Sequence, residues 1–162
     1  MKIKKLLPLV LLAVAAVLML SSCDAMLDAI FPTNQMTVDV AVSKNTIPAA
    51  AFYADWYNAY YFNNNPSTVA LTLTDITAGT STTRVRSWSG ADGIYVNYIF
   101  TFLNLKDHVY SLSAYYNSYS NSISYGPVTT IWDGNIPMSA VQLPYKNSSD
   151  STGHLVDLQM YF

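Results

Sequence analysis

The chain has 162 residues, a formal net charge of −2, and a composition that is 51% hydrophobic and 14% aromatic. This length supports one domain with a hydrophobic core, and the acidic balance with scattered basic residues disfavours binding to nucleic acids. All ten acidic residues are aspartates, which favour turns over helices, and thirteen tyrosines with abundant Thr, Ser and Val favour strands.

The N-terminal segment has the three parts of a secretory signal peptide. Lys2, Lys4 and Lys5 come first, an apolar run follows over residues 6–20, and two serines end the segment. The run is short for a permanent membrane span, which needs about 20 apolar residues. We therefore expect a signal peptide over residues 1–22.

The residues Leu20-Ser21-Ser22-Cys23 resemble the lipobox of bacterial lipoproteins. The resemblance implies that a diacylglycerol is attached to the Cys23 sulfur and that the signal peptide is removed just before it. Two or three lipid chains, at about 0.8 kcal/mol per buried CH₂, would hold the protein on a membrane. Asp24 resembles the signal that retains enteric lipoproteins in the inner membrane, but both the inner and the outer membrane stay open.

Cleavage before Cys23 would leave 140 residues with five basic and ten acidic side chains, a formal charge of 5 − 10 = −5. Cys23 is the only cysteine, so no disulfide can form within the chain. Residues 23–35 are predicted to form a lipidated tether, and residues 36–162 a single domain.

The first two elements of the predicted domain differ in their periodicity. Residues 36–43 alternate apolar and polar side chains, which predicts a half-buried strand. Residues 48–62 carry Phe52, Trp56 and Tyr60 at four-residue spacing behind Pro48, which favours a short helix. An aromatic strand and loop remains the alternative for this insert.

The rest of the chain predicts short strands separated by turns. Strands are expected over 67–75, 83–88, 94–103, 108–116, 122–131, 138–143 and 154–162, with turns at 89–93, 104–107, 117–121 and 133–135. Residues 94–103 are apolar on both faces, which indicates a central strand or one covered on both sides. About eight strands with this spacing predict an all-β sandwich or barrel.

The stretch from Phe100 to Ala114 resembles the corner between two strands in fibronectin type III and other immunoglobulin-like domains. In that corner a tyrosine hydroxyl, here expected at Tyr110, bonds to backbone upstream. Asp92-Gly93-Ile94-Tyr95 is similar to prealbumin-like surface domains. Together the resemblances, over residues 92–95 and 100–114, imply an immunoglobulin-like or prealbumin-like β-sandwich. The closing residues 156–162 resemble the last strand of outer-membrane barrels, so a small barrel is an alternative, although several strands are shorter than 9–11 residues.

The sequence contains no recognised catalytic motif. His108 and His154 stand at strand entries, where exposed histidines are common, and the His-Glu-x-x-His motif is impossible because the chain has no glutamate. Asp133-Gly134-Asn135 and Asp150-Ser151 offer isolated oxygens, fewer than the six to eight that calcium takes. We expect no enzymatic activity, no cofactor and no metal.

Clusters of aromatic residues are the main candidate for function. Most of them can be explained by core packing, but an exposed group could form a platform for a glycan or a protein. The candidate ligand-binding residues are Trp56, Tyr57, Tyr60, Tyr61, Trp88 and Trp132. The sequence therefore predicts a lipid-anchored protein of the cell envelope, with its domain in the periplasm or at the cell surface. Its non-catalytic β-sandwich would serve interaction or envelope structure, and a carbohydrate-binding module is the alternative.

Overall fold

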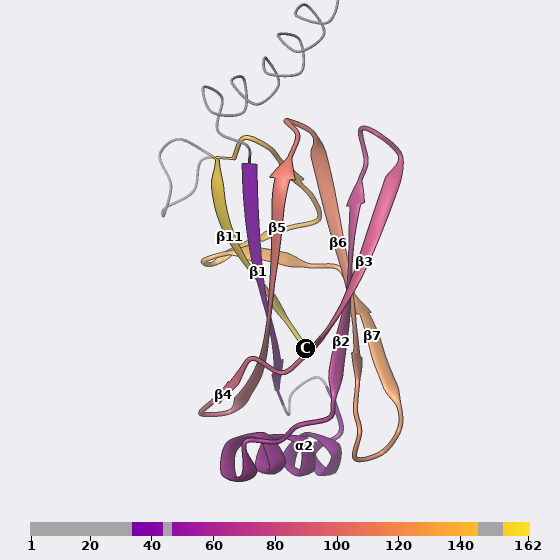
Figure 1. Cartoon of the computed structure of the whole chain (residues 1–162), viewed down its shortest axis with the longest axis vertical. Helices are drawn as coiled ribbons and strands as arrows, with labels where there is room; N and C mark the ends of the chain where they lie inside the picture. The colour runs from indigo at the N-terminus through magenta and orange to yellow at the C-terminus, as the bar shows by residue number, and fades with distance from the viewer. Residues whose placement is uncertain (1–33, 44–46, 146–153) are drawn as a thin grey trace, which may run out of the picture. The chain divides into compact units, whose positions relative to one another are not determined.

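The structure is a computed structural model, and it describes residues 34–43, 47–145 and 154–162. Cys23, the predicted signal peptide, most of the predicted tether and the Asp150-Ser151 loop lie outside the described residues. The described part is mostly β-structure in two sheets with one helix (Figure 1). No helix in this part is long and apolar enough to cross a bilayer.

The strands form a six-stranded sheet, sheet A, and a second sheet, sheet B. The order in sheet A is β4 (Gly90–Asp92), β5 (Tyr95–Leu105), β1 (Asn34–Ser43), β11 (Leu155–Tyr161), β8 (Ile131–Asp133) and β9 (Ile136–Met138). The order in sheet B is β10 (Val141–Gln142), β6 (Val109–Asn117), β2 (Thr68–Asp75) and β3 (Thr80–Ser87), and β7 (Ser124–Val128) also pairs with β6. The prediction of an all-β sandwich is confirmed at the level of two sheets.

Strand β1 lies in the middle of sheet A, where the N-terminal strand of the domain pairs with its C-terminal strand, β11. It pairs antiparallel with β5 and parallel with β11, so that Val38 lies between Phe100 and Leu158. These three side chains are buried. The alternation predicted for 36–43 is confirmed as far as Val40, but Ala41 and Ser43, expected on the outer face, are buried, and the strand begins at Asn34.

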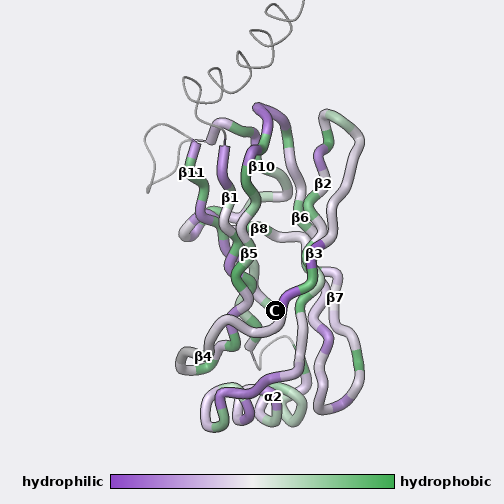
Figure 2. Tube along the Cα trace, in the orientation of Figure 1, coloured by the Kyte–Doolittle hydropathy of each residue, from purple (hydrophilic) through white to green (hydrophobic). Residues whose placement is uncertain are grey.

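The core lies between the two sheets. Strand β2 directs Val69, Leu71 and Leu73 inward, and they pair with buried residues of β6. Hydrophobic and hydrophilic residues alternate along the strands, as Figure 2 shows. One face of each sheet is therefore buried, which is the pattern that fixes strand register.

The helix α2 (Ala49–Phe62) lies across the end of the sandwich opposite to Asn34 (Figure 1). Pro48 precedes it, where proline is tolerated. It ends at Asn63, which adopts a left-handed conformation with φ 50°, and the Asn64 N–H bonds to the Asn58 carbonyl at 3.1 Å. The helical interpretation of residues 48–62 is confirmed, and the strand alternative is wrong.

Strand β5 departs from its prediction. Its inner residues are buried, but Ile99 and Leu103 on the other face are 46% and 58% exposed. Of the two alternatives predicted for this strand, coverage of both faces is wrong, because nothing in the described part of the chain covers Ile99 and Leu103. The strand does lie inside sheet A, between β4 and β1. Apolar residues on both faces thus do not imply burial of both.

Several boundaries also differ. The predicted turn at 89–93 contains β4, which pairs with β5, and the Asp-Gly pair marks the turn that joins them. The predicted strand 138–143 is divided between β9 and β10, and 122–131 between β7 and β8. Strand β3 begins at Thr80, earlier than the predicted 83, because its hydroxyl-bearing residues pair with β2.

Candidate functional site

Helix α2 exposes an unusual number of aromatic side chains. They are Tyr53, Tyr57, Tyr60, Tyr61 and Phe62, between 48% and 64% exposed, and we call them with the half-buried Trp56 the aromatic face of α2. The helix buries only a narrow strip, formed by Ala51, Phe52, Asp55 and Ala59. Three of the six predicted ligand-binding residues, Tyr57, Tyr60 and Tyr61, are therefore exposed together.

The rings of this face pack against one another at steep angles. Tyr57 and Tyr61 have centroids 4.7 Å apart and planes tilted by 41°, and Tyr60 and Tyr61 are nearly perpendicular at 74°. Only Trp56 and Tyr60 are near parallel, at 17°, but their centroids are 5.1 Å apart, so they stack face to face. The face is thus uneven and does not present coplanar rings side by side.

A single buried carboxylate attaches α2 to sheet B. Asp55 is 1% exposed. Its Oδ2 accepts hydrogen bonds from the Tyr116 hydroxyl and, at 2.7 Å, from the Ser118 hydroxyl. Its Oδ1 accepts from the Ser120 hydroxyl and, at 3.2 Å, from the Ser120 amide. All these donors belong to β6 or the turn that follows it, so Asp55 sets how the helix sits on the sandwich.

The backbone around Asp55 is held as well. The Asn65 amide donates to the Asp55 carbonyl at 2.9 Å, and its side-chain oxygen accepts from the Ser67 N–H at 2.7 Å. Burial raises the pKa of Tyr116, and the neighbouring Tyr98 hydroxyl and the bond to Asp55 add to this effect. Tyr116 is therefore a neutral donor to Asp55 at any ordinary pH.

The other predicted aromatic residues lie elsewhere. Trp88 follows β3, is half-buried and packs against the core. Trp132 lies on β8, where its ring meets Tyr161 edge-on at 6.3 Å. The structure therefore brings Trp56, Tyr57, Tyr60 and Tyr61 together and leaves Trp132 on a different element. Cys23 lies outside the described residues.

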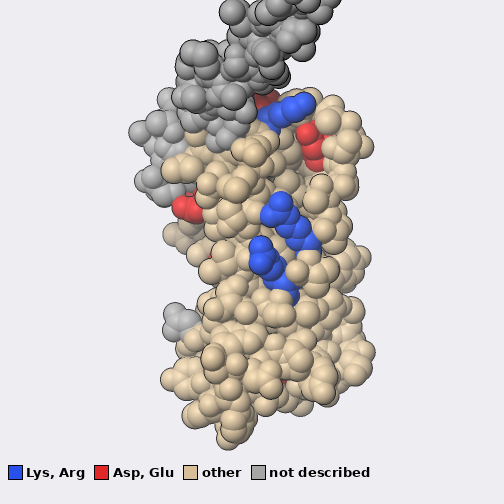
Figure 3. Space-filling view, viewed as in Figure 1, with Lys and Arg blue, Asp and Glu red and all other residues tan. Residues whose placement is uncertain are grey.

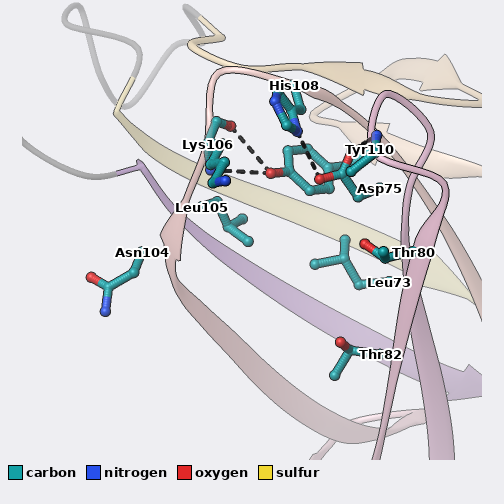
Figure 4. Close-up of a pocket in the computed structure, with 10 residues that line it drawn as sticks. Leu73, Asp75, Thr80, Thr82, Asn104, Leu105, Lys106, His108 and Tyr110 are labelled. Atoms are coloured by element: carbon teal, nitrogen blue, oxygen red, sulfur yellow. Dashed lines mark hydrogen bonds and ion pairs between the residues drawn. The ribbon is translucent and has the colours of Figure 1, made fainter.

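The corner between β5 and β6 forms a second candidate site. A cavity of about 380 Å³ opens there, lined by residues from both sheets (Figure 4). The Tyr110 hydroxyl donates to the Lys106 carbonyl at 3.2 Å and accepts from the Lys106 N–H at 3.1 Å. This bond to backbone four residues upstream was expected from the sequence, and it fixes the turn that carries the chain from sheet A to sheet B.

Both histidines take part in polar contacts. His108 Nδ1 lies 2.8 Å from Asp75 Oδ2, and His154 Nδ1 lies 2.9 Å from Asn34 Oδ1. Desolvation acts to raise the pKa of Asp75, but the hydrogen bonds from His108 and the Ala78 amide and the charge of His108 outweigh it and lower that pKa. The expectation of exposed strand-entry histidines is wrong, because both rings are half-buried and bonded.

The third candidate site is a hollow of about 320 Å³ on the outer face of sheet A, lined in part by Asp39, Asp133 and Asp157. One oxygen of Asp39 is buried with no hydrogen-bond partner in the described part of the chain, and burial raises the pKa of this carboxyl. Within residues 34–43, 47–145 and 154–162, no group of three or more His, Cys, Asp or Glu is placed to hold a metal ion.

Two polar groups of the cavity at the β5–β6 corner are bonded within the protein. His108 is engaged by Asp75, and the Tyr110 hydroxyl in the same cavity is engaged by the Lys106 backbone. Nucleophilic catalysis needs a hydroxyl or thiol within hydrogen-bond reach of a base. Among the described residues, no hydrogen bond joins His108 to a hydroxyl.

Sequence reasoning missed Asp55 and the Asp75–His108 pair. Asp55 could have been noticed as the one charged residue between Ile47 and Phe62, spaced three residues from Phe52 and four from Ala59 on the strip that packs. The Asp75–His108 pair joins residues 33 positions apart, and nothing local in the sequence signals it.

No protein-family model, curated protein or solved structure matches the chain.

Proposed function

We propose that the chain is a lipoprotein of the bacterial cell envelope, anchored through Cys23, whose β-sandwich is a non-catalytic binding module. The aromatic face of α2 binds a partner protein. The observation that carries this proposal is the exposure of five large aromatic side chains on one helix. Monomeric proteins seldom leave such a patch uncovered, and aromatic residues supply much of the energy of protein interfaces.

The charge distribution supports a neutral binding surface. Asp55 is the only Asp, Glu, Lys, Arg or His among the helix residues, and it is buried. The face drawn in Figure 3 shows no Lys or Arg over α2. Depletion of charge together with enrichment in Tyr, Trp and Phe is the composition of an interface core.

The geometry of the rings favours a protein partner over a glycan. A flat sugar platform needs two or three coplanar exposed rings, whereas Tyr57, Tyr60 and Tyr61 are tilted or perpendicular to one another. Tyrosines that project at different angles can fill the pockets of an irregular protein surface at a low cost in conformational entropy. Carbohydrate binding is the second candidate because four of the predicted platform residues lie together on α2 and three of them, Tyr57, Tyr60 and Tyr61, are exposed.

The position of α2 supports presentation of this face. The described domain begins at Asn34, and α2 lies at the opposite end (Figure 1). A lipid anchor on Cys23 would be connected to the domain through Asn34, at the end away from α2.

The hydrogen bond of the Tyr110 hydroxyl at the β5–β6 corner supports an immunoglobulin-like rather than a prealbumin-like sandwich. The immunoglobulin-like fold hosts many binding functions.

Photo-crosslinking in intact cells tests the proposal with the full chain. A photoreactive phenylalanine analogue replaces Tyr57 or Tyr61 in one pair of strains and the equally exposed Ile136 on β9 in a control strain. We expect one defined protein adduct from the two α2 positions and not from position 136. Adding Tyr60→Ser to the Tyr57 probe should reduce the adduct. Equal crosslinking at all three positions, or binding of the purified protein to glycans that Tyr60→Ser abolishes, would contradict a protein partner.

A further inference from the structure

One long edge of the sandwich, between β3 of sheet B and β5 of sheet A, is open in the described part of the chain. Strand β3 is the last strand of sheet B, and β4 pairs with β5 only as far as Asn97. Beyond that point the Ile99 N–H donates to the Ser89 hydroxyl at 2.9 Å, and the Thr101 carbonyl accepts from the Arg84 guanidinium. We call this edge the β3–β5 seam; it faces the viewer in Figure 1.

The Lys and Arg side chains that the structure describes gather on this seam. Arg84, Arg86 and Lys106 are the only Lys or Arg in the described part of the chain, and all three are exposed. Figure 3 shows the basic side chains in a row down this edge. The only ion pair among the described residues is His108–Asp75, so these three cations have no carboxylate partner there. A concentration of cations on an acidic protein implies an anionic partner.

The two arginines have the spacing of a strand. Arg84 and Arg86 pair with Leu71 and Val69, whose side chains face the core, so both arginines point to the inner side of sheet B. Same-face residues on a strand are about 6.7 Å apart. Arg84 is steadied by the Phe102 ring, 4.7 Å from its guanidinium carbon. A second strand with acidic side chains at alternate positions matches this repeat.

The cavity at the β5–β6 corner extends the seam. In Figure 4, Thr80 and Thr82 of β3 stand opposite Asn104 and Leu105 of β5. Lys106 also lines this cavity. The two carboxylates at the Lys106 end of the seam, those of Asp75 and Asp107, already accept hydrogen bonds within the protein.

Asp75 bonds to His108, and Asp107 accepts from the Asn34 amide at 2.7 Å. The strongest attraction for an anion is therefore expected near Arg84 and Arg86.

We propose that the β3–β5 seam binds an extended acidic segment of a partner protein by strand addition to β3, with alternate acidic side chains against Arg84 and Arg86. An edge strand presents a row of unpaired main-chain groups, and a peptide satisfies them where an anionic polysaccharide does not. Charges on edge strands also discourage self-association. The site is separate from the aromatic face of α2 and does not depend on it.

The probe is an acetylated, amidated nonapeptide of alternating glutamate and threonine with a fluorescent label. It is titrated against the full-length lipidated protein in a nonionic detergent, with anisotropy as the readout. Binding is expected to weaken at high salt, and replacing the glutamates by glutamines should abolish it. Methylating every second backbone nitrogen of the probe should abolish binding for one of the two alternate sets and spare the other, because only one set faces β3.

The variants Arg86→Gln and Lys106→Gln remove cations that make no contact essential to packing. Each should weaken binding by about threefold, as for an exposed ion pair. Arg84→Gln should weaken it further but also loses the Phe102 contact, so its folding is checked by circular dichroism. Tyr57→Ser on α2 is the matched control and should leave peptide binding unchanged.

Two results would overturn the inference. One is no measurable binding of the nonapeptide at millimolar concentration. The other is equal binding of both methylated probes together with tighter binding of polygalacturonate, which would identify a polyanion site without strand addition. Because Tyr57→Ser affects only the α2 site, failure of this test and failure of the proposed function are distinguishable.

Discussion

The substitution Asp55→Ala tests how α2 is attached to the sandwich. Asp55 is almost fully buried and accepts bonds from Tyr116, Ser118 and Ser120, the last through both its hydroxyl and its amide. A hydrogen bond to a charged group contributes about 1.5–3 kcal/mol, and bonds that share one acceptor are not additive. Removal of the carboxylate also leaves buried donors unsatisfied. We therefore expect the free energy of unfolding to fall by about 3–5 kcal/mol.

The assay is urea unfolding of a soluble form that begins at Asp24, followed by circular dichroism. For a domain of this size the loss corresponds to a fall in Tm of about 10–20 °C. Asp157→Ala, at an exposed position of β11, is the matched control and should change stability by less than about 0.5 kcal/mol. A double-mutant cycle with Tyr116→Phe should give a coupling of about 1–3 kcal/mol. A loss below about 1 kcal/mol for Asp55→Ala would refute this role of the carboxylate.

Three further substitutions test other parts of the structure. Burial raises the pKa of Asp39 in the folded protein above its value in the unfolded chain, so the free energy of unfolding falls as the pH rises from the unfolded pKa to the folded pKa. Asp39→Asn should therefore stabilise the protein at pH 7 but not below pH 3. Urea unfolding at both pH values checks this. Tyr110→Phe loses both bonds to Lys106 and should cost about 1–2 kcal/mol in the same assay, and an unchanged midpoint would contradict the corner's role. Gly126→Ala should lower the free energy of unfolding by about 2 kcal/mol or more, because φ is +125° and a Cβ would lie 2.7 Å from the Ala114 carbonyl oxygen. Gly134→Ala, where a Cβ would meet open space, should lower it by less. Equal decreases for the two variants would count against the steric argument.

Much of the sandwich could be predicted from periodicity. The alternation of Met36, Val38 and Val40 reports one buried face directly, because successive side chains of a strand point to opposite sides. The same rule placed Tyr110 and Leu112 correctly in the core. The aromatic helix was also predicted, since the spacing of Phe52, Trp56 and Tyr60 follows the helical repeat.

The remaining features depend on contacts that no local pattern carries. Ile99 and Leu103 look like core residues in the sequence, and only the arrangement of the sheets shows that they are exposed. The parallel pairing of β1 with β11 joins the two ends of the domain. Arg84, Arg86 and Lys106 appeared scattered in the sequence. The seam brings them to one face because β3 ends sheet B and β5, beyond its short pairing with β4, lies beside it at the edge of sheet A. The sequence likewise did not decide whether the aromatic rings of α2 are exposed, because residues with this spacing can also form a buried stripe in the core.

The proposed site of action depends on the anchor, so the most direct test is the intact mass of the protein purified from its native membrane. We expect a chain that begins at Cys23 and carries a diacylglycerol thioether on that sulfur, with or without a third acyl chain. An unmodified Cys23 sulfur, or a chain that retains residues 1–22, would contradict it.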